Sequence, residues 1–186
     1  MSISASYSFI AGDRGAWEVT SMSRVIGEAL EAAPFFEIRN EYLIRPPVDF
    51  RWLLRGVTSS QRYVESPGQA NLMSAQPQLG RPGATCAAFI PIRKKDEWWA
   101  LTEEERHALF GENSNQSASG LRGLPSVARK LHHCRDLSEP FDFLTWFEYE
   151  PRDSAAFEDM IAEMRATEEW KYVEREVDVR LVLRSA

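Results

Sequence analysis

Alternating apolar and polar positions recur along the chain and predict β-strands, with helical spacing in the segments between them. The run over 85–92 is almost continuously apolar, which is typical of a strand buried on both faces. The run over 141–149 is dense in aromatic residues and gives the strongest strand signal. The predicted strands cover residues 6–10, 16–20, 35–45, 50–58, 85–92, 141–149 and 172–183.

Four segments show apolar residues at helical spacing. The first, 25–33, has Ser21 or Ser23 as a possible N-cap. The second, 102–110, opens with the capping box Thr102-Glu-Glu-Glu105. In a capping box the Thr102 hydroxyl and the Glu105 carboxylate each accept a hydrogen bond from the backbone N–H of the other residue. The other two predicted helices cover residues 121–134 and 154–165.

The order of these elements suggests two β-α-β-β-like halves without a residue-level repeat. A loop-like segment rich in Ser, Pro, Gly and Gln, residues 59–83, lies between them. This order predicts an α+β fold with helices covering one face of antiparallel sheets. A length of 186 residues favours one domain over residues 1–186.

Composition and charge exclude several classes of protein. The net charge of −6 argues against a general nucleic-acid binder, which needs a basic face. No window approaches 18 consecutive apolar residues, so no membrane span is expected. Two cysteines, Cys86 and Cys134, do not form a disulfide framework. The N-terminal residues lack a secretory pattern, so a cytoplasmic location is expected.

Two groups of residues indicate binding chemistry, although no common nucleotide, hydrolase or metal motif is present. Lys94 at a strand exit is followed by Trp98 and Trp99, and an ammonium beside indoles can hold a flat anionic ligand. Arg129 and His133 are four positions apart on a predicted helix and therefore share one face. That face is either a solvated polar stripe or an electropositive surface that looks into a cavity.

Several long stretches together resemble the chlorite dismutase family, most closely its short-chain branch of dimers. The stretches are GVTSSQRYVE (56–65), IPIRKKDEWW (90–99), LPSVARKLHHCRDLSEPFDFLTWFEYEP (124–151) and RATEEWKYVEREVDVRL (165–181). The resemblance extends from about residue 15 to residue 181. It implies a homodimer of ferredoxin-like α/β barrels that carries haem b between a sheet and helices. The reaction implied is conversion of chlorite, or another small oxidant, to chloride and dioxygen.

The resemblance also implies roles for individual residues. Arg129 matches the distal arginine above the open face of the haem, where a permanently charged, forked donor can retain a small oxyanion. Tyr63, Lys94 and Trp99 match residues that touch the haem propionates, with Trp98 adjacent. The acidic partner of the proximal ligand matches Glu168 or Glu169, and the sequence leaves both open.

One position departs from the family pattern. Gln116 stands where the family has the proximal histidine that ligates iron. An amide oxygen is a weaker iron ligand than imidazole, so haem affinity and activity are expected to be reduced. The chain is then a relative that lost haem, a ligand variant, or a haem binder that uses water or Gln116. The alternative functions are a haemless relative whose barrel cavity takes another small ligand and, with less support, a coproporphyrin-haem decarboxylase.

Overall fold

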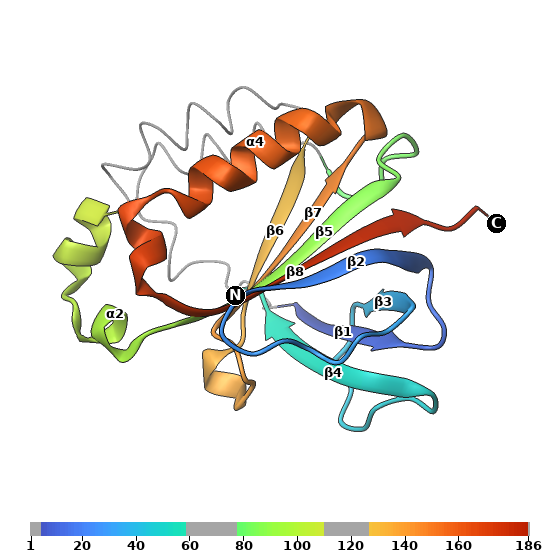
Figure 1. Ribbon diagram of the computed structural model, residues 1–186. Helices are drawn as coiled ribbons and strands as arrows, with labels where there is room; N and C mark the ends of the chain where they lie inside the picture. Colours follow the sequence, from blue (N-terminus) through green and yellow to red (C-terminus); the bar gives the residue numbers. More distant parts are fainter. Residues whose placement is uncertain (1–4, 59–77, 110–126, 186) are drawn as a thin grey trace.

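The computed structural model describes residues 5–58, 78–109 and 127–185 (Figure 1). Within these residues, eight strands form one closed antiparallel barrel in the order β1-β3-β2-β8-β5-β7-β6-β4. The strands are β1 (Ser6–Gly12), β2 (Trp17–Ile26), β3 (Phe35–Arg39), β4 (Phe50–Val57), β5 (Cys86–Lys94), β6 (Ala128–His133), β7 (Phe143–Tyr149) and β8 (Val173–Leu183).

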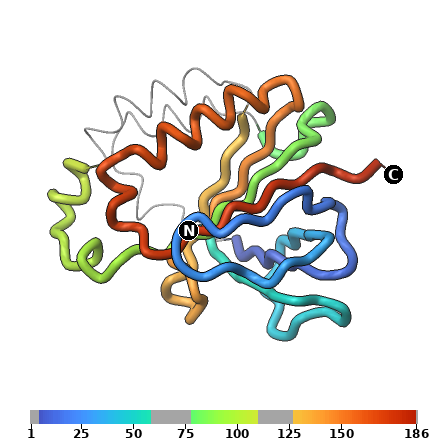
Figure 2. Tube along the Cα trace, viewed as in Figure 1, coloured from blue at the N-terminus to red at the C-terminus, as the bar shows by residue number. Residues whose placement is uncertain are grey.

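Helices and several short turns accompany the barrel in the described ranges. Helix α4 crosses the outer face of β5, β6 and β7, while α2 lies beyond one end of the strands (Figure 2). The capping box predicted at Thr102 is present, with Thr102 N 2.8 Å from Glu105 Oε2 and residues 103–109 helical. The labelled helices and 3-10 turns are α2 (Asp96–Ala100), α4 (Ser154–Arg165), η1 (Arg135–Leu137), η2 (Pro151–Asp153) and η3 (Glu168–Tyr172).

The strands separate two hydrophobic cores. The first lies inside the barrel and the second lies between the barrel wall and α4. The interior core includes Phe9, Phe36, Trp52, Phe89, Trp146 and Val179. The outer core includes Ile90, Phe147, Tyr149, Phe157 and Ile161.

Strand β5 belongs to both cores, as its continuous apolar run predicts. Ala87 and Phe89 point into the barrel, whereas Ala88 and Ile90 belong to the core under α4. β5 pairs with β7 on one side and β8 on the other, so its backbone is satisfied in the middle of the wall. The prediction of a strand buried on both faces is confirmed.

The predicted helix over 25–33 is wrong. β2 continues to Ile26 because it pairs with β8 over eight registered positions, ending at Ile26 opposite Glu176. Long-range pairing with an 11-residue strand outweighs the local helical spacing. Gly27, with φ of 73°, turns the chain at the end of β2, and no helix follows it before β3.

The described part of the predicted helix over 121–134 is also wrong. Residues 128–133 form β6, which pairs with β7 over six positions. Leu131, which would lie on the apolar side of a helix, is exposed. The strand period of two places Arg129 and His133 on one face and His132 on the other. The expected shared face of Arg129 and His133 is therefore kept, although the element is different.

The remaining strands and helix 154–165 were located correctly, and the strand predicted over 35–45 is shorter, ending at Arg39. The structure agrees with the predicted α+β class and with helices against one face of antiparallel strands, which close into a barrel. None of the helices in the described ranges combines the length and apolar content required to cross a bilayer.

Candidate functional site

Lys94 is a buried cation at the end of β5, on the α4 side of the barrel. Its side chain is 1% exposed, and its Nζ donates to Glu169 Oε1 at 2.7 Å. The ammonium lies 4.1 Å from the ring centroid of Trp98 and 5.6 Å from that of Trp170. Burial lowers the pKa of Lys94, and the charge of Glu169 opposes that effect. An ion pair between two indoles is held rigidly and screened from water.

The two candidate acids on η3 face different environments. Glu169 turns inward to Lys94. Glu168 is exposed, and both of its oxygens accept from Lys171 Nζ at 2.7 Å. Of the two positions that the sequence left open, only Glu169 contributes its carboxylate to the buried cluster.

Trp98 and Trp99 follow Lys94 on α2 and lie in different surroundings. Trp98 is buried and packs against Tyr172, with ring centroids 5.5 Å apart. Trp99 stacks on Phe143 at 6.0 Å, and the guanidinium of Arg135 covers its ring at 3.7 Å. The buried Nε1 of Trp99 has no hydrogen-bond partner among the described residues. Trp99 therefore offers a donor at the end of this face.

Arg129 lies on the outer face of β6, next to the aromatic wall of β7. Its guanidinium carbon is 5.9 Å from the ring centroid of Phe147. Burial lowers the pKa of Arg129, while the negative charge of Glu169 opposes that effect. The Nε atom is shielded from solvent and has no partner within the part of the chain that the structure describes. A buried, unpaired guanidinium N–H is unusual and favours an acceptor brought by a ligand.

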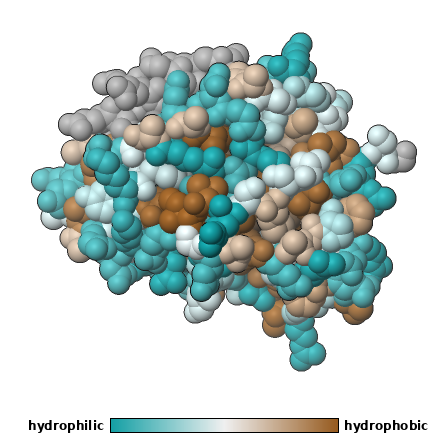
Figure 3. Space-filling model, in the orientation of Figure 1, coloured by the Kyte–Doolittle hydropathy of each residue, from teal (hydrophilic) through white to brown (hydrophobic). Residues whose placement is uncertain are grey.

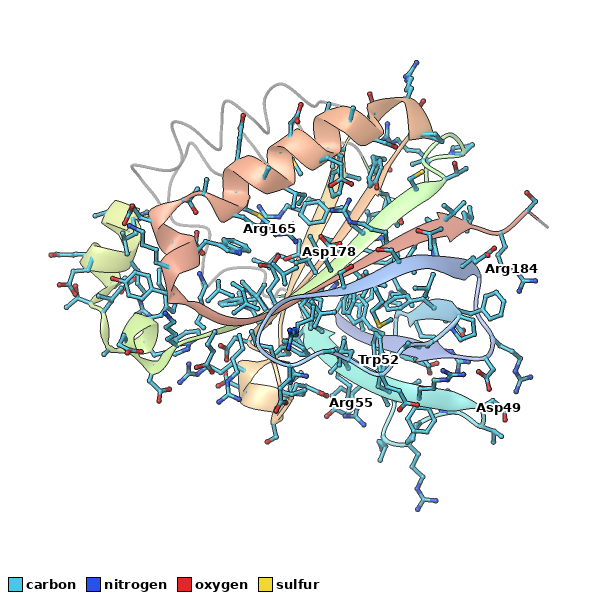
Figure 4. All side chains as sticks on the ribbon, in the orientation of Figure 1. Asp49, Trp52, Arg55, Arg165, Asp178 and Arg184 are labelled. Carbon is cyan, nitrogen blue, oxygen red and sulfur yellow. The ribbon has the colours of Figure 1, made fainter. Side chains whose placement is uncertain are left out.

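An ion-pair network under α4 fixes the segment that carries Glu169. Arg165, at the end of α4, donates to Glu176 at 2.8 Å and to Asp178 at 2.7 Å on β8. Figure 4 shows Arg165 pointing from the helix toward Asp178. Trp170 of η3 donates from Nε1 to Glu176 at 2.7 Å. These contacts hold α4 and η3 on the barrel and so position Glu169.

Several residues of this region carried no individual signal in the sequence. Asp142 accepts the backbone N–H of Lys94 at 2.7 Å, Trp170 flanks the ammonium, and Arg135 covers Trp99. Each is brought in by strand pairing or by a turn far away in sequence. A buried acid directly before an aromatic strand is the only pattern that hints at Asp142.

Two of the predicted site residues, Tyr63 and Gln116, lie outside the described residues. Glu168 is exposed and paired with Lys171. The other predicted residues lie on the α4 side of the barrel wall, where the charge of Glu169 acts on both Lys94 and Arg129. Figure 3 shows hydrophobic side chains gathered between α2 and the start of β8, on a face that is otherwise largely hydrophilic. Cations, indoles and an apolar wall together suit a flat, anionic ligand.

Comparisons with known proteins show the family to which the chain is similar. A family model described as chlorite dismutase matches residues 41–184. The chlorite dismutase of Ideonella dechloratans is 31% identical over 126 residues, which cover 64% of this chain. The chain spans only 40% of the length of that relative.

Solved structures of chlorite dismutases have a fold similar to that of this chain. The dimeric chlorite dismutase of Nitrobacter winogradskyi is 50% identical, with a TM-score of 0.85 over 95% of this chain and 99% of that one. Chlorite dismutase from Candidatus Nitrospira defluvii, in complex with imidazole, is 20% identical and matches in fold with a TM-score of 0.68 over 95% of this chain and 90% of that one. Because the family model covers most of the sequence, this chain belongs to the chlorite dismutase family.

Proposed function

We propose that the protein binds haem b on the α4 side of the barrel and converts chlorite to chloride and dioxygen. The observation that carries the proposal is Arg129, a partly buried residue whose Nε is shielded from solvent and has no partner among the described residues. A permanent positive charge in such a place is costly unless an anion or acceptor joins it. Chlorite is a small anion that a forked donor can hold.

The described residues fit one side and one edge of a haem. Trp99 offers an unpartnered Nε1 donor, and Lys94 is an ammonium beside Trp98. An ammonium has three donors, so contact with Glu169 leaves others for a propionate. The expected contact of Tyr63 with a propionate remains part of the proposal.

Bound haem would supply an iron centre that takes an oxygen atom from chlorite. Arg129 then has two duties of its own. It attracts the substrate anion, and it would hold the hypochlorite anion that remains after chlorite gives up one oxygen atom, until the single O–O bond of dioxygen forms and the remaining Cl–O bond breaks to release chloride. Chlorite contains every atom of chloride and dioxygen, so no further reactant is required.

Gln116 weakens the proximal side in this proposal. Its amide oxygen or a water replaces the imidazole of the family pattern, and Glu169 has no imidazole N–H to orient. We therefore expect haem affinity and turnover below those of a histidine-ligated relative. The structure gives Glu169 another partner, Lys94, which holds its carboxylate in place at 2.7 Å.

The assembly is proposed by analogy with the 50% identical Nitrobacter winogradskyi protein, which is dimeric. We propose a homodimer of ferredoxin-like α/β barrels. Its formation is measured by light scattering with and without haemin.

A haemin titration tests the function. The native chain and Gln116→His are titrated while the Soret band is recorded, and oxygen release from chlorite is then followed with an electrode. We expect the native chain to bind haemin, Gln116→His to bind it more tightly, and both to release oxygen. Failure of both proteins to bind haemin would overturn the proposal.

Arg129 has its own test, with Arg135 as the matched control. Arg129→Ala should lower the oxygen yield per chlorite because hypochlorite escapes, whereas haemin still binds. Arg135→Ala removes an exposed guanidinium that covers Trp99 without reaching Arg129. Unchanged yield in Arg129→Ala would remove Arg129 from the mechanism.

A haemless relative is the second candidate, and Gln116 is the observation that favours it. It predicts that only Gln116→His gains a Soret band. The decarboxylase alternative predicts turnover of coproporphyrin haem with peroxide, and mass spectrometry of the porphyrin product distinguishes it from the other two.

A further inference from the structure

A cavity lies on the inner side of the barrel wall, on the side away from α4 and the proposed haem site. Its volume is about 310 Å³, at the small end of the range for small-molecule sites, about 300–1,000 Å³. Aromatic rings form much of its lining, including Tyr7 and Phe9 of β1, Trp17 of β2 and Trp146 of β7. Trp17 and Trp146 meet edge to face, with centroids 5.3 Å apart.

His132 offers a hydrogen-bond acceptor to this cavity. The residue is 2% exposed, and its ring lies edge-on to Tyr7 and Phe9, each at 4.9 Å. Nδ1 lies 3.1 Å from the carbonyl oxygen of Leu144, so Nδ1 carries the hydrogen and Nε2 carries the lone pair. Nε2 is buried and has no partner among the described residues. A buried acceptor of this kind calls for a donor on a ligand.

Lys130 supplies a positive charge two positions away on the same face of β6. Its Nζ donates to the hydroxyl of Tyr7 and lies 4.2 Å from the centroid of that ring. Among the described residues, the contacts of the Lys130 ammonium are with Tyr7 and not with an acid, although the carboxylate of Glu148 also lines the cavity. Glu148 is occupied, because it accepts from Trp146 Nε1 at 2.9 Å and from Gly80 N at 2.6 Å. The ammonium therefore has donors left for an anion.

This cavity is separate from the proposed haem site. Alternation along β6 sends Arg129 to the outer face, against Phe147, and sends Lys130 and His132 inward. The barrel wall itself stands between the two. A ligand in one place cannot contact the residues of the other.

We propose that the inner cavity is a second binding site, for a small aromatic carboxylic acid that carries a hydroxyl group. The ring would stack among Tyr7, Phe9 and Trp146. The carboxylate would accept from the Lys130 ammonium, and the hydroxyl would donate to Nε2 of His132. The site is independent of haem and of Gln116.

Calorimetric titration with 4-hydroxybenzoate tests the proposal. Benzoate lacks the donor and phenol lacks the charge, so the native chain should bind both more weakly. Lys130→Met should weaken binding of 4-hydroxybenzoate about tenfold or more and leave phenol unaffected. His132→Phe should weaken 4-hydroxybenzoate several-fold and leave benzoate unaffected.

Controls separate this site from the outer face and from general charge effects. Lys95→Met removes an exposed ammonium that donates to the carbonyl of Lys171, and it should leave the affinity unchanged. Loss of binding in Arg129→Ala, with binding retained in Lys130→Met, would place the probe in the outer site and overturn the proposal. Absence of binding to the native chain at millimolar concentration would overturn it as well.

Spectroscopy of the native chain provides a readout that does not depend on how the variants fold. The ¹⁵N resonance of His132 Nε2 should shift when 4-hydroxybenzoate binds, because the lone pair accepts a hydrogen bond. Benzoate should leave that resonance in place. An unchanged Nε2 resonance at saturation with 4-hydroxybenzoate would contradict the assigned role of His132.

Discussion

Lys94 and Glu169 form a buried ion pair with a 2.7 Å contact, although they are 75 positions apart in the chain. Lys94 ends the strand at the centre of the wall, and Glu169 lies on the turn between α4 and β8. The pair therefore ties the turn to the barrel at the edge of the proposed haem site. Its ammonium lies over the ring of Trp98, which excludes water from one side.

Glu169→Gln should destabilise the protein by about 3 kcal/mol, because it leaves the Lys94 ammonium buried without its counter-charge. Glu168→Gln is the matched control, since it changes the neighbouring residue and an exposed ion pair. Its cost should be below about 1 kcal/mol. Urea unfolding of both variants measures the difference. Equal losses in the free energy of unfolding would mean that the buried pair of Lys94 and Glu169 stabilises the protein no more than the exposed pair of Glu168 and Lys171.

Removal of Arg165 should loosen α4 from the barrel. Arg165→Leu leaves Glu176, whose side chain is 0% exposed, with the indole of Trp170 as its side-chain donor among the described residues. Asp178 keeps Arg180. We expect a loss of about 3 kcal/mol in the free energy of unfolding.

The control for Arg165→Leu is Arg152→Leu, which removes an arginine that is 75% exposed and paired with Glu150. It should cost less than about 1 kcal/mol. Adding Glu176→Gln to Arg165→Leu should restore part of the loss, because no buried charge is then unpaired. A double variant no more stable than Arg165→Leu alone would argue against this explanation.

The central strands and α4 could be predicted from the local sequence, because the apolar positions within each segment already indicate which faces are buried. β5 and β7 are apolar on both faces, and the 12-residue amphipathic helix α4 was predicted with its observed bounds. β6 was mistaken for a helix because Val127, Ala128 and Leu131 fit helical spacing. Its strand state depends on pairing with β7, a contact that spacing along one segment does not reveal.

The candidate site likewise combines residues that could be predicted from the sequence with residues that only packing determines. The resemblance indicated Lys94, Trp98, Trp99 and Arg129. The structure places these four residues on the α4 side of the barrel wall. The resemblance could not separate Glu168 from Glu169, because both occupy one short turn and only packing decides which turns inward. His132 had no predicted role in the site, and strand alternation places its side chain inside the barrel, away from Arg129 and His133.

Gly56→Ala should weaken the junction between β4 and β6. A Cβ at this position would lie 2.7 Å from Cβ of His132 and 3.3 Å from Leu144 Cδ1. The two strands are paired at Val57 and His133 alone among the described positions, so little else holds the junction against the clash. We expect a loss of about 1–3 kcal/mol, as is usual for overpacking.

Gly83→Ala is the control for that substitution. Its Cβ would meet only the end of the Glu150 side chain, at 3.2 Å, and that side chain can move. Thermal unfolding should show a smaller change than for Gly56→Ala. The same loss in both variants would indicate a general cost of replacing glycine rather than a clash at His132.

Protonation of His132 should destabilise the fold at acidic pH. Burial lowers the pKa of His132 from 6.5 to about 4. Below pH 6.5 the unfolded chain takes up a proton that the folded protein does not. The free energy of unfolding therefore decreases as the pH is lowered from 6.5 to about 4. The shift corresponds to about 3 kcal/mol over that range.

His132→Gln removes the titrating ring and isolates its contribution. The difference in free energy of unfolding between the native chain and His132→Gln should be constant above pH 6.5 and should shrink by about 3 kcal/mol between pH 6.5 and 4. All other groups cancel in that difference if they are unchanged by the substitution. A difference that stays level across the whole range would show that folding does not shift the pKa of His132. The folded ring would then take up a proton below about pH 6.5, and Nε2 would be a donor, rather than the acceptor that the inner cavity requires, in that range.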